Sequence, residues 1–270
     1  MKFTKMQGIG NDYVYINCFE ETVHNPAELS KKVSDRHFGI GSDGLILICP
    51  SETADCRMRM FNADGSESAM CGNGIRCVGK YVFDHKLVDK TEFDVETDAG
   101  IKHLKITPEN GKAVKITVDM GIPEVTSALP ELIVIDGKEY EFIGISVGNP
   151  HAIYYMNDID ELDLESIGPA FEFHERFPER TNSEYIEVKS RDYIRMRVWE
   201  RGSGETWACG TGATASAVAS VLSGRTENTV EVELKGGNLT IFWDRENSGH
   251  VFMTGPAVEV FEGEFDINNL

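Results

Sequence analysis

The chain has 270 residues, of which 41% are hydrophobic, so it is long enough for one large or two medium globular domains. Its formal net charge of −19 argues against nucleic-acid and anionic-membrane partners, because phosphate contacts need clustered lysine and arginine. No apolar run is long enough for a signal peptide or a membrane helix, so we expect a cytoplasmic protein whose six cysteines are thiols.

Short runs typical of β-strands dominate the first half of the chain. The expected strands are Val14–Cys18, Leu45–Cys49, Cys56–Phe61, Phe93–Thr97, Ile101–Ile106 and Val114–Met120. A helix is expected to begin at Asn25-Pro26 and to run towards His37, because asparagine caps a helix and proline fits its first turn. A second helix is expected over Gly74–Phe83.

The second half of the chain repeats this composition. Its expected strands are Ile153–Met156, Glu184–Val188, Tyr193–Glu200, Val230–Leu234, Leu239–Trp243 and Val258–Phe261. One helix is expected to start at Asp163 and to end near Phe173. Another is expected over Gly212–Leu222, where alternate alanines favour helix strongly.

Two cysteines stand in matching glycine-rich sequences that lie 138 positions apart. These sequences are Ala69-Met70-Cys71-Gly72-Asn73-Gly74 and Trp207-Ala208-Cys209-Gly210-Thr211-Gly212. At the same offset Gly10-Asn11 recurs as Gly148-Asn149, and Glu67 recurs as Glu205. Each asparagine therefore precedes its cysteine by 60 positions, which indicates an internal duplication.

The duplication predicts an α+β fold with two pseudo-symmetric domains, each a mostly antiparallel sheet wrapped around a central helix. We expect an N-terminal domain over residues 1–117, completed by the C-terminal segment 260–270, and a C-terminal domain over residues 118–259. No low-complexity linker separates the halves, so the active site is expected in the cleft between the two domains.

The two cysteines are each expected at, or just before, the start of a helix. The N–H groups of a helix N-terminus bind carboxylates, and the same field can lower a cysteine pKa from about 8.5 to roughly 3.5–7.5. Two glycine-capped helices that happen to begin with cysteine would explain each sequence alone. They would not explain why both copies of a diverged duplication keep Cys71 and Cys209. A doubled thiol suggests two acid–base groups on opposite sides of one substrate, which is the chemistry that inverts a carbon stereocentre.

Three other motif interpretations are not favoured. Gly39–Gly44 has the GxGxxG spacing of a dinucleotide-binding turn, but it precedes an expected strand where that motif must follow one. Gly74–Lys80 resembles a phosphate-binding loop, yet Tyr81 replaces the required serine or threonine. No CxxC pair or histidine cluster accompanies the cysteines, so we expect no metal site. The other thiols are expected to be small buried hydrophobic side chains: Cys18, Cys49, Cys56 and Cys77.

The motifs closely resemble those of the diaminopimelate epimerases, in family order and over almost the whole chain. The matching stretches are Met6–Asp12, Phe61–Ser66, Met70–Cys77, Gly148–His151, Glu200–Thr206 and Ala208–Gly212. Proline racemases are similar but carry histidine where this chain has Asn73. The phenazine-biosynthesis isomerases share the fold without this cysteine pair. The sequence departs from many diaminopimelate epimerases at Gly44, where they have a substrate-binding glutamine.

The resemblance implies an isomerase that needs no pyridoxal phosphate or other cofactor. It would interconvert LL- and meso-diaminopimelate, a small-molecule substrate on the route to lysine and peptidoglycan, and would be a homodimer. Cys71 and Cys209 would be the acid–base residues, tuned by His151 and Glu200. The carboxylate at the reacting carbon would be held by Gly72, Asn73, Gly210 and Thr211. The remaining polar groups of the substrate would be bound by Asn11, Asn62, Asn149, Asn182, Glu200 and Arg201.

Two alternatives stay open. A proline or hydroxyproline racemase would need a small apolar pocket and no site for a distal ammonium and carboxylate. The asparagines and Glu200-Arg201 argue against that activity. A thiol-based redox or binding protein would have an easily cycled disulfide and would catalyse no exchange of an α-proton.

Overall fold

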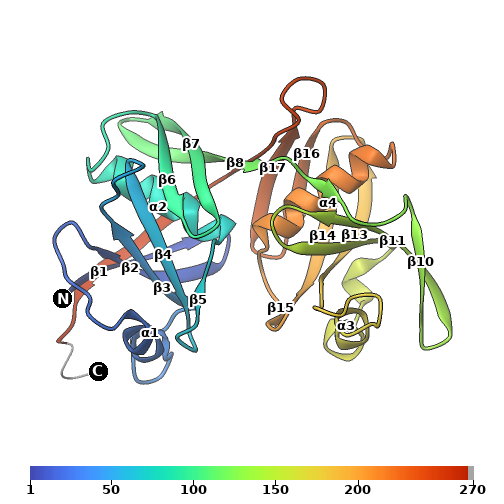
Figure 1. Ribbon diagram of the computed structural model, residues 1–270, viewed down its shortest axis with the longest axis horizontal. Helices are drawn as coiled ribbons and strands as arrows, with labels where there is room; N and C mark the ends of the chain where they lie inside the picture. Colours follow the sequence, from blue (N-terminus) through green and yellow to red (C-terminus); the bar gives the residue numbers. More distant parts are fainter. Residues whose placement is uncertain (267–270) are drawn as a thin grey trace. The chain divides into compact units, whose positions relative to one another are not determined.

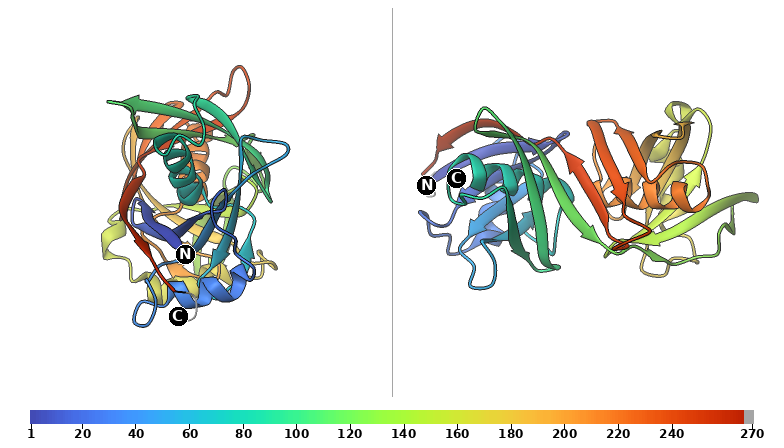
Figure 2. Two further views of the ribbon diagram at one scale, coloured as in Figure 1. Left: turned by 90° about the vertical axis from the view of Figure 1, so that its left-hand side faces the viewer. Right: turned by 90° about the horizontal axis from the view of Figure 1, so that it is seen from above.

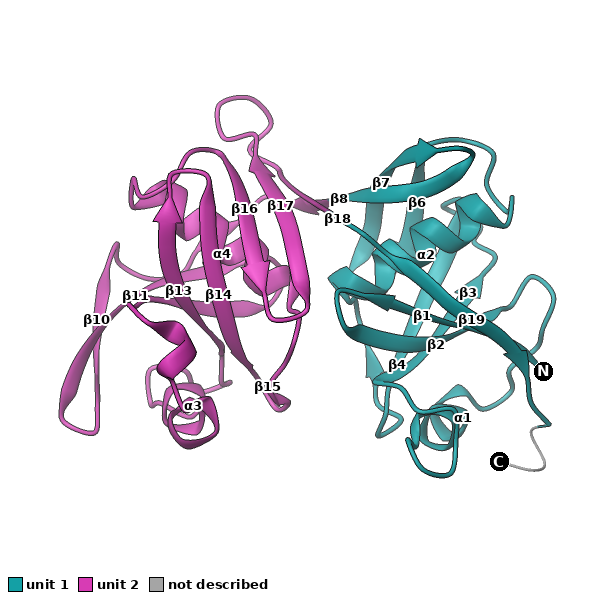
Figure 3. Cartoon of the chain, turned by 180° about the vertical axis from the view of Figure 1, so that it is seen from behind, with its two compact units in different colours: residues 1–118, 255–270 teal, residues 119–254 magenta. Residues whose placement is uncertain are grey.

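The computed structural model describes residues 1–266, which fold into two compact units. Unit 1 comprises residues 1–118 together with the segment that begins at Gly255, and unit 2 comprises residues 119–254 (Figures 1 and 3). The C-terminal strand therefore folds with the N-terminal half of the chain. None of the helices in the described residues is long and apolar enough to span a bilayer.

Unit 1 is built on one sheet with the strand order β19-β1-β2-β3-β4-β6-β7-β8. The β2–β3 and β4–β6 pairs are parallel, and the other pairs are antiparallel. The short β5 forms a hairpin with β4. The strands are β1 (Lys2–Gly8), β2 (Asn11–Asn17), β3 (Gly44–Cys49), β4 (Cys56–Asn62), β5 (Glu67–Ser68), β6 (Glu92–Thr97), β7 (Gly100–Glu109), β8 (Lys112–Gly121) and β19 (Val258–Glu264).

Helix α2 (Gly72–Asp84) is the central helix of unit 1, and the sheet wraps around it (Figure 2). Of its 13 residues, only Lys80 and Asp84 are not buried. Helix α1 (Pro26–Ser34) covers the opposite face of the sheet, where its Leu29 and Val33 pack with Leu45 and Leu47 of β3. Successive side chains of a strand point to opposite faces of its sheet, so alternate residues of β3 lie in the cores on the two faces.

Unit 2 repeats this construction. Its strands are β9 (Glu124–Val125), β10 (Glu131–Ile135), β11 (Lys138–Ser146), β12 (Pro150–Tyr155), β13 (Asn182–Ser190), β14 (Tyr193–Glu200), β15 (Gly204–Glu205), β16 (Thr229–Leu234), β17 (Gly237–Trp243) and β18 (Val251–Gly255). Its helices are η1 (Ile159–Glu161), α3 (Leu164–Glu172) and α4 (Gly210–Leu222). Helix α4 is the central one, and only its Thr211 and Leu222 are not buried.

The two sheets have the same order of pairings. From β1 in unit 1 and from β11 in unit 2, successive pairs are antiparallel, parallel, antiparallel, parallel, antiparallel and antiparallel. In both units the central helix follows the hairpin that contains the shortest strand, β5 or β15. This shared topology confirms the α+β fold with two similar halves.

The expected helices are all present, with shifted ends. Helices α2 and α4 begin two residues earlier than expected, because the cysteine itself is the cap residue. Helix α1 stops at Ser34 and does not reach His37, because the side chain of Asp35 accepts hydrogen bonds from the N–H groups of His37 and Phe38 and turns the chain. Strands β1, β10, β11 and β18 and the two-residue strands β5, β9 and β15 are outside the expected ranges. The hydrophobic pattern of a strand is hidden in β1 because the charged Lys5 is buried there, in an ion pair with Asp12.

Candidate active site

Cys71 is the cap residue of α2, and its sulfur accepts a hydrogen bond from the Gly74 N–H at 3.3 Å. The glycine is needed for close packing of this first turn, since a Cβ on Gly74 would lie 2.6 Å from Ile46 Cδ1. The Cys71 thiol also donates to Asn11 Oδ1 at 3.4 Å. The thiol therefore takes the place that serine, aspartate or asparagine usually fills at a helix start.

Asn11 is held in one orientation by a neighbouring carboxylate. Its Nδ2 donates to Asp43 Oδ2 at 2.8 Å, and Arg36 Nη2 donates to the other oxygen of Asp43 at 2.8 Å. Because Asp43 engages the amide nitrogen, the amide oxygen of Asn11 is the atom that faces Cys71. An oxygen acceptor in this position fits Cys71 as a protonated thiol.

Cys209 occupies the equivalent cap position on α4. Its sulfur accepts from the Gly212 N–H at 3.3 Å and lies 3.5 Å from Thr211 Oγ1. Burial raises the pKa of Cys209 well above its usual value, and the carboxylates of Glu200 and Glu184 raise this pKa further. A helix start alone would lower a cysteine pKa, but at Cys209 burial and negative charge outweigh that effect.

Glu200, the last residue of β14, lies in hydrogen-bonding contact with the Cys209 thiol. Thr206 donates its hydroxyl to Glu200 Oε1 across the β14–β15 turn. Burial raises the pKa of Glu200, and the nearby Glu184 carboxylate adds to this rise. Two acidic groups whose charged forms are both disfavoured by burial thus sit side by side.

His151, on β12, is the centre of a hydrogen-bonded chain that ends at Cys209. Its Nδ1 lies 2.7 Å from Glu184 Oε1, and its Nε2 lies 3.0 Å from Asn149 Oδ1. The Asn149 Nδ2 donates to Thr211 Oγ1 at 3.4 Å, and that hydroxyl contacts the Cys209 sulfur. The side chains of His151 and Glu184 are completely buried.

Asn182 and Arg201 are joined through the backbone. The Asn182 Oδ1 accepts from the Arg201 N–H at 3.0 Å, and the Asn182 Nδ2 donates to the Pro150 carbonyl at 2.8 Å. The guanidinium of Arg201 is exposed and donates to the Glu179 carbonyl at 3.3 Å. Asn182 therefore acts here as a brace for the Arg201 turn, while the charged end of Arg201 reaches solvent.

In unit 1 the first turn of α2 is organised by an arginine that the sequence analysis did not select. Arg76 is fully buried and donates to the Gly72 carbonyl at 3.0 Å and to Asn73 Oδ1 at 2.9 Å. Burial lowers the pKa of this guanidinium. Asn62, at the end of β4, donates its Nδ2 to Ser66 Oγ at 3.0 Å and is half-buried.

Gly44 is the position where the resemblance predicts that a glutamine contact is lost. A Cβ at this position would lie 2.1 Å from the Phe61 carbonyl oxygen and 2.8 Å from the ring of Tyr13. The adjacent backbone therefore leaves no room for any side chain at Gly44 in this packing.

Each unit presents a thiol at the start of its central helix. Gly72 and Asn73 in unit 1, and Gly210 and Thr211 in unit 2, form the first helical turn, where N–H groups have no acceptor within the helix. Such a turn binds a carboxylate, and a thiol beside it can exchange a proton with an adjacent carbon acid. Unit 1 brings Asn11 to its thiol, and unit 2 brings Asn149, Thr211, His151 and Glu200 to its own.

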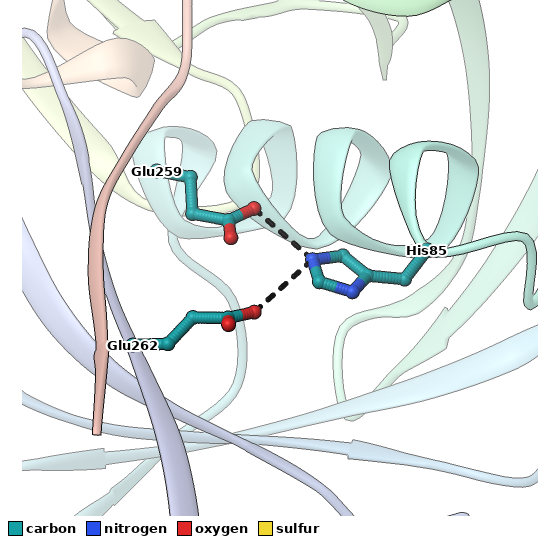
Figure 4. A group of neighbouring side chains, drawn as sticks. All are labelled: His85, Glu259 and Glu262. Carbon is teal, nitrogen blue, oxygen red and sulfur yellow. Dashed lines mark hydrogen bonds and ion pairs between the residues drawn. The ribbon is translucent and has the colours of Figure 1, made fainter.

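One group of side chains among residues 1–266 has the geometry of a metal chelate, and it does not involve either thiol. His85 Nε2 lies 3.1 Å from Glu259 Oε2 and 3.9 Å from Glu262 Oε1 (Figure 4). The three ligand atoms all lie within 4.8 Å of one another. His85 follows the last residue of α2, so the group sits at the opposite end of that helix from Cys71. As it stands, the group joins the end of α2 to β19 by polar contacts of His85 with Glu259 and Glu262.

The chain matches the family model described as diaminopimelate epimerase over residues 3–126 and 143–260. A diaminopimelate epimerase of Acetivibrio thermocellus is 58% identical over 281 residues, and the match covers 100% of both chains. A diaminopimelate epimerase of Methanococcus maripaludis strain S2 is 55% identical over 278 residues, covering 99% of this chain and 100% of the relative.

Solved structures with low sequence identity share the fold. A phenazine biosynthesis protein of the PhzF family from Bacillus anthracis has a TM-score of 0.77 at 17% identity, with 99% of each chain covered. A probable proline racemase from Agrobacterium radiobacter K84 has a TM-score of 0.78 at 14% identity, covering 98% of this chain and 93% of that structure. At these identities the likeness concerns the fold alone.

Proposed function

Because the chain belongs to the diaminopimelate epimerase family, we propose that it converts LL-2,6-diaminopimelate to meso-diaminopimelate, and back, without a cofactor. This activity supplies precursors for lysine and peptidoglycan. The observation that carries the proposal is the repeated cap geometry. Cys71 and Cys209 each accept a hydrogen bond at 3.3 Å from the third residue of the helix that follows, beside N–H groups suited to a carboxylate.

The proposed reaction uses one thiolate and one thiol. The thiolate removes the α-proton from one face of the carbon, and the thiol delivers its own proton to the other face. The C–H bond that breaks and the C–H bond that forms are on the same carbon, so the configuration inverts with no net redox change. Each thiol carries one proton, so inversion needs both Cys71 and Cys209, and their roles exchange with the substrate isomer.

Proton transfer by a positioned group supplies about 10²–10⁴-fold in rate, which is too little for so weak a carbon acid. The rest must come from stabilising the carboxylate that receives negative charge as the proton leaves. We assign this to the first-turn N–H groups of Gly72 and Asn73 and of Gly210 and Thr211, acting where water is excluded.

Glu200 and His151 would set the protonation of the thiols. The pKa of Cys209 is raised chiefly by burial, so an ionised Cys209 needs a neighbour that accepts its proton. Glu200 contacts this thiol, and burial raises its own pKa as well, so its carboxylate accepts a proton more readily than an exposed one would. His151 reaches Cys209 only through Asn149 and Thr211 within unit 2.

The substrate's second amino and carboxylate groups would be bound by Asn11, Asn62, Asn149, Asn182, Glu200 and Arg201. The exposed guanidinium of Arg201 supports this assignment, since a planar donor pair suits a carboxylate. A proline or hydroxyproline racemase is the alternative within the same fold. It has no use for a distal carboxylate site, so Arg201 and its brace Asn182 favour diaminopimelate.

The decisive assay follows exchange of the α-hydrogen in deuterated water, with LL-diaminopimelate, meso-diaminopimelate and L-proline as separate substrates. We expect exchange and epimerisation of diaminopimelate only. Exchange of proline but not diaminopimelate would identify the racemase. Absence of exchange with all three, together with ready disulfide cycling, would identify a redox or binding protein. Cys71→Ala and Cys209→Ala should each abolish epimerisation, and substantial turnover by either variant would exclude the two-base reaction.

The family expectation of a cytoplasmic homodimer is part of the same proposal. Light scattering coupled to size exclusion measures the mass in solution, and twice the 30.0 kDa of one chain is the expected result. Activity that survives exhaustive dialysis, with no gain on adding pyridoxal phosphate, is the expected result for a cofactor-independent reaction.

A further inference from the structure

Glu184 is a buried acid that the resemblance to the epimerases does not select. It is the third residue of β13, in the middle of the unit 2 sheet, and its side chain has no exposed surface. Helix α4 packs directly on it, because a Cβ on Gly212 would lie 2.6 Å from Glu184 Oε1. Its other oxygen, Oε2, is buried and has no hydrogen-bond partner. A carboxylate kept in such a place costs stability and needs a reason.

The hydrogen-bond chain from Glu184 fixes where the protons of His151 lie. The Asn149 Nδ2 donates to Thr211 Oγ1, so Asn149 Oδ1 is the atom that faces His151 Nε2. An oxygen acceptor at 3.0 Å requires a proton on Nε2. The contact of 2.7 Å between His151 Nδ1 and Glu184 Oε1 then also needs a proton between the two atoms. Without that proton, a lone pair of the ring would face a lone pair of the carboxylate.

The histidine–carboxylate pair therefore carries one shared proton and no net charge, whichever atom holds that proton. We propose that Glu184 is a positioning residue: it locks His151 with its Nε2–H towards Asn149, and so aligns the Asn149 amide and the Thr211 hydroxyl at Cys209. The proposal rests on the proposed epimerase function for its kinetic consequences, but not for the arrangement itself.

Unit 1 also contains a carboxylate that orients an asparagine near a cysteine. Asn11, which stands 138 positions before Asn149, is oriented by the Asp43 carboxylate at 2.8 Å and presents its oxygen to Cys71. In unit 2 the carboxylate acts through an inserted histidine, and the Asn149 amide turns its nitrogen towards the cysteine side. Both halves thus use a carboxylate remote from the sulfur to set the orientation of the asparagine beside the thiol. The two asparagines present opposite ends of the amide: Asn11 turns its oxygen to the Cys71 thiol, and Asn149 turns its nitrogen to the Thr211 hydroxyl beside Cys209.

The test uses the full chain and two substitutions. Glu184→Gln keeps the size and can still donate from its amide to Nδ1 of a neutral ring, so it should keep the Nε2–H tautomer. Glu184→Leu fills the same space but leaves the buried Nδ1 without a partner. Glu187→Gln, on the same strand and in surface ion pairs with Lys189 and Arg195, is the matched control.

The first readout needs no substrate. Protein labelled with ¹⁵N-histidine is examined by proton–nitrogen correlation spectra, and the His151 signals are assigned from their loss in His151→Asn. We expect protons on both ring nitrogens, or one strongly shared with Glu184, in the native chain and in Glu187→Gln. Only Nε2 should be protonated in Glu184→Gln, and a mixture of tautomers should appear in Glu184→Leu. A native chain or a Glu184→Gln variant in which His151 Nε2 carries no proton would overturn the proposal, even if Glu184→Leu does not fold.

The second readout is kinetic. Loss of the hydrogen-bonding group that orients a metal-ligating histidine typically costs about 10–100-fold, and the same range is taken for His151. We expect Glu184→Leu to lose about that factor in kcat with little change in KM, Glu184→Gln to lose less, and Glu187→Gln to lose nothing. A folded Glu184→Leu variant with unaltered kcat would also overturn the proposal. If the native chain epimerises no diaminopimelate, the proposed function fails, while the histidine spectra still decide the role of Glu184.

Discussion

Glu172 Oε2 accepts a hydrogen bond from Trp199 Nε1 at 2.8 Å, which ties the last residue of α3 to the strand that ends at Glu200. The other oxygen of Glu172 accepts from the Gly202 N–H at 2.9 Å. A single buried carboxylate therefore holds both sides of the turn that presents Glu200 and Arg201. The side chain that positions this turn comes from a helix about 30 residues earlier.

Glu172→Gln should loosen this turn. A glutamine can accept at only one of the two positions, so one buried N–H loses its partner, at about 1–3 kcal/mol. We expect the free energy of unfolding in urea to fall by that amount and KM for diaminopimelate to rise more than kcat falls. Glu175→Gln removes an exposed carboxylate from the following segment and should change neither quantity. Equal stability and KM in the two variants would contradict the assigned role.

Gly212→Ala should damage the site through crowding. The new Cβ would lie 2.6 Å from Glu184 Oε1 and 3.1 Å from Cys209 Sγ, so the carboxylate or the thiol must move. Overpacking of this kind costs about 1–3 kcal/mol, and we expect kcat to fall at least tenfold with it. Ser216→Ala, on the buried face of the same helix, is the control and should leave kcat unchanged. Stability is measured by urea unfolding. A native-like kcat in Gly212→Ala would contradict the predicted effect of crowding.

Gly44→Gln should not restore the substrate contact of the relatives. Its Cβ would lie 2.1 Å from the Phe61 carbonyl oxygen, and the strand pair β3–β4 would have to separate locally. We expect a loss of about 1–3 kcal/mol or more, seen as a lower midpoint in thermal unfolding, with no improvement in KM. An unchanged midpoint together with a lower KM would show that the strands adjust readily.

Glu200 should make stability depend on pH in a defined direction. Burial raises its pKa in the folded protein, so folding favours the protonated carboxyl. The stability that Glu200 contributes is fully present below its pKa of about 4.5 in the unfolded chain. This stability is lost as the pH rises through the higher pKa of Glu200 in the folded protein. Relative to the native chain, Glu200→Gln should therefore gain stability as the pH rises above about 4.5.

Glu205 supplies a control of opposite sign. Burial alone would raise its pKa, but Arg197 and Lys235 lower it overall, so its contribution is lost as the pH falls. Urea unfolding of Glu200→Gln and Glu205→Gln across the acidic to neutral range measures how the free energy of unfolding of each variant changes with pH. Parallel curves for the two variants would contradict the raised pKa of Glu200.

Mild oxidation tests whether both thiols serve one substrate. If they do, we expect Cys71 and Cys209 to come together when no substrate lies between them, so that oxidation joins them and inactivates reversibly with thiol reductants. Cys18 and Cys49 are hydrogen-bonded neighbours and can form a competing disulfide, so the experiment uses a Cys49→Ser background. Peptide mapping should find the Cys71–Cys209 link. Its absence under conditions that do inactivate the enzyme would contradict the two-thiol site.

The helix starts were predictable because their causes are local. Cysteine followed by glycine, a capping asparagine before proline, and an alanine-rich run all act within one or two turns, so α1, α2, α3 and α4 were expected at nearly their observed places. The duplication was visible because its landmarks keep a constant offset. Strand β1 was missed because burial of Lys5 depends on an ion pair with Asp12, which sits on the next strand.

The sequence by itself therefore determined the family, the fold class and the two thiols at helix starts, since these depend on short motifs. Only the tertiary structure decided which carboxylates act on them. His151 pairs with Asn182 in the parallel β12–β13 ladder, and this register brings Glu184, two residues further on, against the imidazole ring. Asp43 reaches Asn11 and Glu172 reaches Trp199 by similar non-local packing. Strand register sets these contacts, and register depends on the whole sheet and not on any local pattern.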